Sequence, residues 1–179
     1  MNATLRAPQL VDYSAIASWI PDAKACIRWA GPLMPFPFTA AELETLLSVA
    51  RGESYCLAKA GNAPYGFGQH FVVEQGSVHL GRIIVSPAAR GKGLGRELCR
   101  QLIARAIQAT GPSAVTLRVY RDNPTALHLY SGLGFIPVEL RSTEEVLFME
   151  LRANGSAHTD KQHQVAASRR VLHAGSLER

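Results

Sequence analysis

The chain has 179 residues, of which 47% are hydrophobic and 18% are charged, a size and composition that fit one globular domain and exclude a disordered protein. No apolar run approaches the ~20 residues that span a bilayer, and the N-terminus lacks the basic and apolar regions of a signal peptide, so we expect no membrane segment. The net charge is +5, but three of these charges belong to residues 152–179 and no dense basic stripe occurs elsewhere, so nucleic-acid binding is disfavoured.

The cysteines point to a reducing environment. Cys26, Cys56 and Cys99 are odd in number, widely spaced and form no CxxC pair. This pattern favours reduced, buried thiols and a cytoplasmic location over disulfides or a zinc site. We therefore expect no bound metal.

The N-terminal half predicts helices followed by antiparallel strands. Pro21 separates two helical stretches, residues 31–38 are too rich in proline for regular structure, and Thr39 and Glu42 have the spacing of a capping box. Turns at 61–64 and 75–76 divide three strand-like runs. The predicted elements are a strand at 4–6, helices at 12–20, 22–29 and 39–50, and strands at 54–60, 65–74 and 77–85.

The C-terminal half alternates helices and strands. A single apolar face predicts a helix over 93–109, and Asn123 followed by Pro124 predicts an N-cap and the first helical position of a second helix, over 124–131. Strands are predicted at 114–120, 135–140 and 145–151. Residues 1–151 then form one domain, and the polar, basic tail at 152–179 is flexible or loosely helical, with a partner-binding helix as the alternative. The apolar face of the first helix consists of Leu94, Leu98, Leu102, Ile103, Ala106 and Ile107.

The junction between the strand at 77–85 and the following helix favours phosphate binding. It reads RGKGLG over 90–95, and glycines let backbone N–H groups approach an anion at the positive end of a helix dipole. Arg90, Lys92 and Arg96 add charge around the turn. A dinucleotide-binding GxGxxG motif is excluded because Arg96 stands at the third glycine position, and no P-loop motif is present. A glycine-rich turn without a ligand is the structural alternative.

Two blocks together resemble the GNAT acetyltransferases. Arg90-x-x-Gly93-x-Gly95 is similar to the family signature R/Q-x-x-G-x-G/A, and NPTALHLYSGLGF over 123–135 is similar to its second motif. The resemblance covers roughly residues 3–151. It implies an α/β (α+β) fold with a mixed, mostly antiparallel central sheet of about seven strands, flanked by helices and splayed at the acetyl-CoA site.

The resemblance also implies a cofactor site. Backbone groups around Ile84 and Val85 would hold the pantetheine arm, the amides of the glycine turn would hold the pyrophosphate, and Tyr130 would act as general acid toward the CoA sulfur. A strand N–H near Val85 is the natural oxyanion donor. The implied cofactor-binding residues are Ile84, Val85, Arg90, Gly91, Lys92, Gly93, Leu94, Gly95, Arg96, Asn123 and Tyr130.

The general base is less well defined by the sequence. Many histone-type relatives carry a glutamate eleven positions before the signature arginine, where this chain has His79. We take His79 as the candidate base, with an unperturbed pKa near ~6.5. Its rivals are His70, Glu74 and a water chain without a single base.

The acceptor is expected to bind between the N-terminal helices and the last two strands. Scattered acids form no dense cluster, which disfavours a polycationic acceptor, and the second motif does not choose between a peptide and a small amine. The residues that either wall this pocket or pack in the core are Trp19, Trp29, Met34, Phe36 and Phe38. The scattered acids are Asp22, Glu74, Glu139 and Glu144.

The sequence therefore predicts a cytoplasmic N-acetyltransferase. It would move an acetyl group from acetyl-CoA to a primary amine by direct attack in a ternary complex. The alternative is a catalytically weak acyl-CoA-binding regulatory module of the same fold. The expected partners are acetyl-CoA and an amine, with a homodimer left open.

Overall fold

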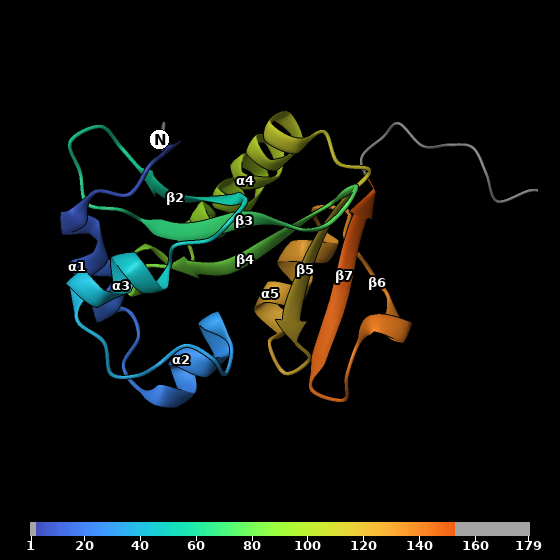
Figure 1. The fold of residues 1–179 in the computed structure, drawn as a ribbon, viewed down its shortest axis with the longest axis horizontal. Helices are drawn as coiled ribbons and strands as arrows, with labels where there is room; N and C mark the ends of the chain where they lie inside the picture. The colour runs from blue at the N-terminus through green and yellow to red at the C-terminus, as the bar shows by residue number, and fades with distance from the viewer. Residues whose placement is uncertain (1–2, 153–179) are drawn as a thin grey trace, which may run out of the picture.

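The computed structural model describes residues 3–152, which form one sheet with helices on both faces (Figure 1). The seven strands lie in the order β1-β2-β3-β4-β5-β7-β6. Only β4 and β5 run parallel, and every other neighbouring pair is antiparallel, which confirms the predicted mixed sheet. The predicted tail lies outside the described residues except for Arg152, which ends β7.

The chain completes one half of the sheet, β1 to β4, before it forms the other half from β5, β6 and β7. In chain order the elements are β1 (Thr4–Arg6), α1 (Leu10–Ser18), α2 (Ala23–Ala30), α3 (Ala40–Leu46), β2 (Gly52–Ala58), β3 (Gly66–Glu74), β4 (Ser77–Val85), a 3-10 turn (Pro87–Ala89), α4 (Leu94–Thr110), β5 (Ala114–Tyr120), α5 (Pro124–Ser131), β6 (Ile136–Pro137), a second 3-10 turn (Glu139–Arg141) and β7 (Val146–Arg152).

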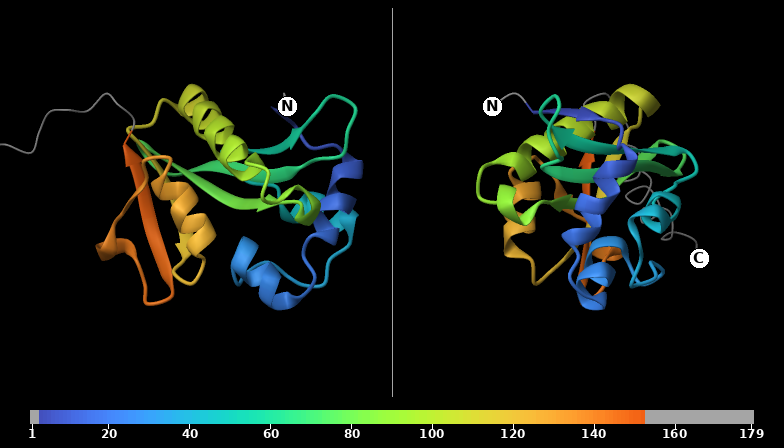
Figure 2. Two further views of the ribbon diagram at one scale, coloured as in Figure 1. Left: turned by 180° about the vertical axis from the view of Figure 1, so that it is seen from behind. Right: turned by 90° about the vertical axis from the view of Figure 1, so that its left-hand side faces the viewer.

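Each face of the sheet buries its own hydrophobic core. On the face that we call the rear, α4 and α5 cover strands β3 to β5, while α1, α2 and α3 pack against the front face (Figure 2). Because side chains alternate between faces along a strand, β2 and β4 supply residues to both cores. The rear core includes Val78, Leu80, Leu98, Leu102, Val115 and Leu117, and the front core includes Ile16, Leu43, Leu47, Cys56 and Phe67.

Four predicted elements differ from the structure by two residues or more at one end. The strand expected at 54–60 is β2, at Gly52–Ala58. The first helix covers Leu10–Ser18, not 12–20, because the N–H of Gln9 donates to the Asp12 carboxylate at 2.7 Å and begins the helix earlier. The third helix ends at Leu46, since the chain turns after Leu47 toward β2. The predicted strand at 135–140 is reduced to Ile136–Pro137, because the chain enters a 3-10 turn at Glu139–Arg141 after one further bond, from Val138 N–H to Phe148 O.

The pairing of β4 with β5 ends halfway along both strands. Paired positions run only from Ser77–Ala114 to Leu80–Leu117, although β4 continues to Val85 and β5 to Tyr120. Beyond Leu80 and Leu117 the two strands diverge, and β5 and β7 run away from β2 to β4 in Figure 1. The predicted splay of the sheet is therefore present at the end of β4.

Two further expectations concern the cysteines and membrane-spanning helices. Cys26, Cys56 and Cys99 are all buried and unpaired, which confirms the prediction of buried thiols. Across residues 3–152, no helix combines the length and the apolar character needed to cross a membrane.

Candidate active site

A cavity of about 580 Å³ opens on the rear face where β4 and β5 diverge. We call it the rear cavity. It is lined by the end of β4, the glycine turn, the start of α4 and one side of α5. Its lining residues are Ile83, Ile84, Val85, Arg90, Gly91, Gly93, Gly95, Arg96, Cys99, Asn123, Thr125, Ala126, Leu129 and Tyr130. Every residue predicted to bind the cofactor belongs to this set except Lys92 and Leu94.

The glycine turn presents bare backbone to this cavity. Gly91 and Gly93 have φ angles of +72° and +76°, a left-handed conformation that glycine adopts without steric cost. A Cβ added at either position would meet no atom within 4 Å, so open space lies over both. Within residues 3–152, none of the amides of residues 91–96 donates to another residue, and the first helical bond of α4 is Glu97 N–H to Gly93 O. The turn therefore offers a row of unused donors at a helix N-terminus, which suits a diphosphate.

The basic side chains near the turn bind backbone carbonyls rather than carboxylates. Arg90 donates to Val85 O at 3.3 Å, Lys92 to Ala88 O at 2.9 Å and Arg96 to Gly132 O at 2.9 Å. Because carbonyl groups are neutral, these contacts leave the positive charges at the cavity uncompensated. An anionic ligand would supply the missing negative charge.

Asn123 and Tyr130 hold the far side of the cavity. The Asn123 side chain accepts a hydrogen bond from Ala126 N at 3.1 Å, and Pro124 occupies the first helical position, which confirms the predicted cap of α5. Tyr130 is buried, and its ring packs edge-on against Phe135. Burial, followed by the charge on Cys99, raises the pKa of the Tyr130 phenol, so the hydroxyl keeps its proton at neutral pH.

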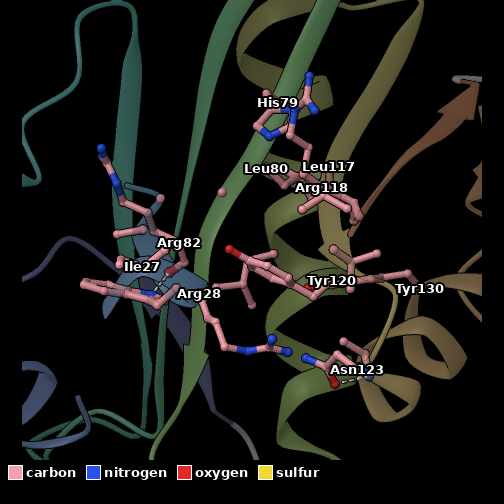
Figure 3. Close-up of a pocket in the computed structure, with 18 of the residues that line it drawn as sticks. Ile27, Arg28, His79, Leu80, Arg82, Leu117, Arg118, Tyr120, Asn123 and Tyr130 are labelled. Carbon is pink, nitrogen blue, oxygen red and sulfur yellow. Dashed lines mark hydrogen bonds between the residues drawn. The ribbon is translucent and has the colours of Figure 1, made fainter. Parts of the chain in front are cut away.

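A second cavity, of about 620 Å³, lies on the front face of the same splay (Figure 3). We call it the front pocket. It is walled by α2 and the loop after it, by the front-facing side chains of β4 and β5, and by the start of β7. Residues that line it include Ile27, Arg28, Trp29, Phe71, His79, Arg82, Arg118, Tyr120, Thr143 and Val146.

The two cavities meet inside the splay. Ile83, Asn123, Ala126 and Tyr130 line both of them. A ligand entering from the rear would therefore reach a second ligand entering from the front, and Tyr130 borders the place where they meet. Such a meeting point suits the transfer of a group between two substrates.

His79 lies at one end of the front pocket, away from Asn123 (Figure 3). It belongs to the paired part of β4, one residue before the splay, and its Nδ1 is 2.9 Å from Thr116 Oγ1. Its ring packs between Phe71 and Phe148. Burial, and then the charges of Arg118 and Arg141, lower the pKa of His79 to about 4, so the imidazole is neutral at pH 7.

The two rival bases do not line the front pocket. His70 stacks on Tyr55, which belongs to the rear core, so it lies on the opposite face of β3. Glu74 ends β3 and pairs with Arg141 at 3.1 Å. Neither residue contacts the point where the two cavities meet.

A β-bulge in β4 shapes the boundary between the two cavities. Gly81 and Ile84 pair with Gln69 and Phe67, so Arg82 and Ile83 together face a single residue of β3. Arg82 has a φ of +51°, which is strained for a residue with a side chain. The Trp29 indole N–H donates to Arg82 O at 2.7 Å and ties the bulge to α2. Such a bulge leaves backbone groups unpaired beside the splay.

Of the aromatic residues proposed for the acceptor site, only Trp29 lines the front pocket. Trp19 and Met34 are buried in the front core, and Phe36 and Phe38 pack against that core and against each other. Of the four scattered acids, none lines the pocket. Asp22 caps α2 through Ala25 N, and Glu139 pairs with Arg121.

Arg28, Arg82 and Arg118 line the front pocket although no motif of the sequence includes them. Their role in the front pocket depends on α2 and β7 meeting the splay, so no local pattern identifies them. The available signal was the alternation of side chains along β5. Arg118 and Tyr120 alternate there with apolar residues that face the rear core. Among the described residues, no group of three or more metal-ligating side chains is arranged to hold an ion.

Comparison with known proteins gives matches at three levels. The family model described as the acetyltransferase (GNAT) family matches residues 23–135. Over 62 residues, or 35% of the chain, the sequence is 47% identical to a mycothiol acetyltransferase of Gordonia bronchialis, and over 59 residues it is 44% identical to an uncharacterised protein of Mycobacterium leprae. These matches cover 19% and 15% of the two relatives' own length, so the chain spans a minor part of each.

Solved structures share the fold at low sequence identity. A spermidine N-acetyltransferase from Vibrio cholerae in complex with CoA and spermine matches with a TM-score of 0.69 and 21% identity, over 84% of this chain and 95% of that one. A dodecameric structure of spermidine N-acetyltransferase from the same organism matches with a TM-score of 0.63 and 22% identity, over 84% and 93%.

Proposed function

The chain belongs to the acetyltransferase (GNAT) family, and from that premise we propose that it transfers an acetyl group from acetyl-CoA to a primary amine. The observation that carries this proposal is the junction of two cavities at Ile83, Asn123, Ala126 and Tyr130. One cavity fits a diphosphate-bearing donor, and the other is open to an acceptor from the opposite face. Direct attack in a ternary complex needs this arrangement.

The residues of the rear cavity fit coenzyme A. The amides of residues 91–96 would bind the pyrophosphate, and the charges of Arg90, Lys92 and Arg96 would balance it. Ile84 and Val85 lie at the end of β4, beyond its pairing with β5. The edge of β4 that is left open there would bind the pantetheine arm. Acetyl-CoA supplies an acyl group that is activated as a thioester.

We propose that Tyr130 is the general acid. As the amine nitrogen bonds to the acetyl carbon, the carbon–sulfur bond breaks and the departing thiolate takes a proton from the Tyr130 hydroxyl. The raised pKa of Tyr130 ensures that this proton is present, and solvent restores it afterwards. The Val85 N–H would stabilise the developing oxyanion. Because Ser86 N–H donates to Tyr65 O, Val85 and Gly66 form a non-hydrogen-bonded pair, and the Val85 N–H points away from β3 toward the side that β5 leaves open.

We propose that His79 accepts the amine proton through water. Thr116 Oγ1 lies 3.4 Å from Val78 O, to which it donates, so it accepts from His79 Nδ1–H and leaves Nε2 unprotonated. His79 lies in the paired part of β4 and is not among the residues that line both cavities, which favours a water relay over direct contact. The arginines around the pocket assist, because they lower the pKa of a bound ammonium group.

The direct test is a panel of primary amines and peptides incubated with acetyl-CoA, with release of free CoA as the readout. The expected result is amine-dependent release, together with an acetylated product by mass spectrometry. Acetyl-CoA should also raise the melting temperature, because it binds only the folded state. Binding without turnover for any amine would instead support the regulatory module and contradict the proposed reaction.

A further inference from the structure

The front pocket is lined by three arginines and by no carboxylate. Arg28, Arg82 and Arg118 all belong to its lining, while no aspartate or glutamate of the described chain does. An acceptor that enters this pocket therefore meets a positive potential. Since the inference concerns the acceptor, it rests on the proposed acetyl transfer.

Two of the three arginines already have side-chain partners. Arg28 forms a bidentate pair with Asp122 at 3.1 and 2.5 Å and stacks over the Tyr120 ring. Arg82 donates to Gln69 Oε1 at 2.7 Å. Gln69 is fully buried and is itself oriented by hydrogen bonds to the end of α3 and to β2, so the Arg82 side chain is held away from the splay.

Arg118 is the arginine whose charge is not satisfied. Within residues 3–152 it forms neither an ion pair nor a side-chain hydrogen bond, and its guanidinium lies 5.3 Å from the centre of the Phe148 ring. It is the first residue of β5 beyond the last pair with β4, at Leu117, so it stands at the opening of the splay on the front face. Figure 3 shows it beside His79, across the pocket from Arg82.

We propose that the acceptor is a primary amine that carries a carboxylate, and that Arg118 binds this carboxylate through its guanidinium. A planar guanidinium matches a carboxylate in a bidentate contact, which gives the pair a defined geometry. The same charge opposes a second ammonium group on the acceptor.

This acceptor class differs from the polyamine named for the structural neighbours, which is bound by those proteins. A polyamine presents further ammonium groups wherever it is held. In the front pocket these would face Arg82 and Arg118, which no carboxylate of the described residues balances, whereas Asp122 balances Arg28. A shared backbone fold therefore does not imply the same acceptor, because the pocket is lined by side chains and not by the backbone.

The test compares three acceptors that differ only in their second group. β-Alanine carries a carboxylate, β-alaninamide a neutral amide and 1,3-diaminopropane a second ammonium, and a longer set consists of 5-aminopentanoate, 5-aminopentanamide and 1,5-diaminopentane. The expected order of kcat/KM is carboxylate, then carboxamide, then diamine, with a difference of at least about tenfold between the first and the last. A diamine that equals or exceeds the amino acid at both lengths overturns the acceptor class.

Variants at two arginines assign the effect to one residue. Arg118→Gln should lower kcat/KM for the carboxylate about tenfold or more relative to kcat/KM for the carboxamide, and so abolish the preference, while the KM for acetyl-CoA stays unchanged. Arg141→Gln is the matched control, because Arg141 also lies over the Phe148 ring but pairs with Glu74 and does not line the pocket. It should keep the preference of the wild type. An unchanged preference in Arg118→Gln refutes the assignment of Arg118.

The outcomes separate this inference from the proposed reaction. Transfer to the diamine but not to the amino acid refutes only the acceptor class. If none of the six amines is acetylated but another amine or peptide of the wider panel is, only the acceptor class fails. If acetyl-CoA binds and no amine of either set is acetylated, the proposed reaction fails as well. Because the Arg118 side chain is exposed, its replacement should leave the fold intact, which circular dichroism and the melting temperature will verify.

Discussion

Replacing Gly93 by alanine should weaken acetyl-CoA binding far more than it weakens the fold. Gly93 is the N-cap of α4 with a φ of +76°, and Gly111 is its C-cap with a φ of +53°. A Cβ at either position meets no atom within 4 Å, so both substitutions cost only the left-handed backbone strain, about 1–2 kcal/mol. For a domain of this size, each variant should melt about 2–8 °C lower than the wild type without ligand.

Only the Gly93 variant should affect the ligand. Gly93 lines the rear cavity and Gly111 does not, so the new methyl group of Gly93→Ala would occupy the space above the unused amides. Losing one charge-assisted hydrogen bond to a phosphate costs about 1.5–3 kcal/mol. This corresponds to an increase of about 10- to 150-fold in the Kd for acetyl-CoA.

Isothermal titration calorimetry on both variants tests this reasoning. Gly111→Ala should bind acetyl-CoA with the affinity of the wild type, since it introduces the same backbone strain at a position that does not line the rear cavity. If Gly93→Ala also binds with unchanged affinity, the pyrophosphate does not lie over this turn. If both variants lose affinity equally, the loss results from destabilisation of the fold and not from a change in the cofactor site.

Three further predictions concern single side chains. Tyr130→Phe should reduce kcat by about 100-fold or more, as expected for a lost general acid, and leave the Kd for acetyl-CoA unchanged in calorimetry; an unaffected kcat would remove Tyr130 from the mechanism. The pKa of His79 is about 4 in the folded protein and about 6.5 in the unfolded chain, so the unfolded chain takes up the proton first as the pH falls. The free energy of unfolding should therefore drop by about 2 kcal/mol between pH 7 and pH 5. Urea titrations at the two pH values should show this drop shrinking in His79→Gln, and an equal drop in the variant would contradict the shifted pKa. Trp29→Phe removes the 2.7 Å hydrogen bond to Arg82 O and should lower the free energy of unfolding in urea by about 1 kcal/mol. The KM for the amine should rise, because the bulge in β4 is no longer held to α2. A variant with wild-type stability and KM would show that this bond is not needed.

The elements with strong local signals were predicted with the correct bounds. The strand at 77–85, the strand at 114–120 and the helix that begins at Pro124 all agree with the structure. Each is delimited by residues next to it in the chain, such as the Asn123 cap, so the signal and the structure have the same range. The rear cavity was predictable for the same reason, since its turn is formed by consecutive residues from 90 to 96.

The front pocket has no comparable local signal. Trp29 reaches the carbonyl of Arg82, which is 53 positions away, and Arg28 reaches Asp122, which is 94 positions away. These contacts depend on how α2 crosses the splay, which follows from tertiary packing and not from any periodicity near residue 29. The bulge at Arg82 is similarly invisible, because an arginine in a strand gives no sign of a positive φ.

The β5 sequence AVTLRVY illustrates how one strand can serve both halves of the site. Val115, Leu117 and Val119 face the rear core, whereas Arg118 and Tyr120 face the front pocket. As long as β5 is paired with β4, these two faces are separated by the sheet. Because pairing ends at Leu117, the two faces communicate through the gap, and Tyr130 borders it. If the ladder continued to Val119 and closed the gap, the donor and the acceptor would bind on opposite sides of an intact sheet and the transfer could not occur.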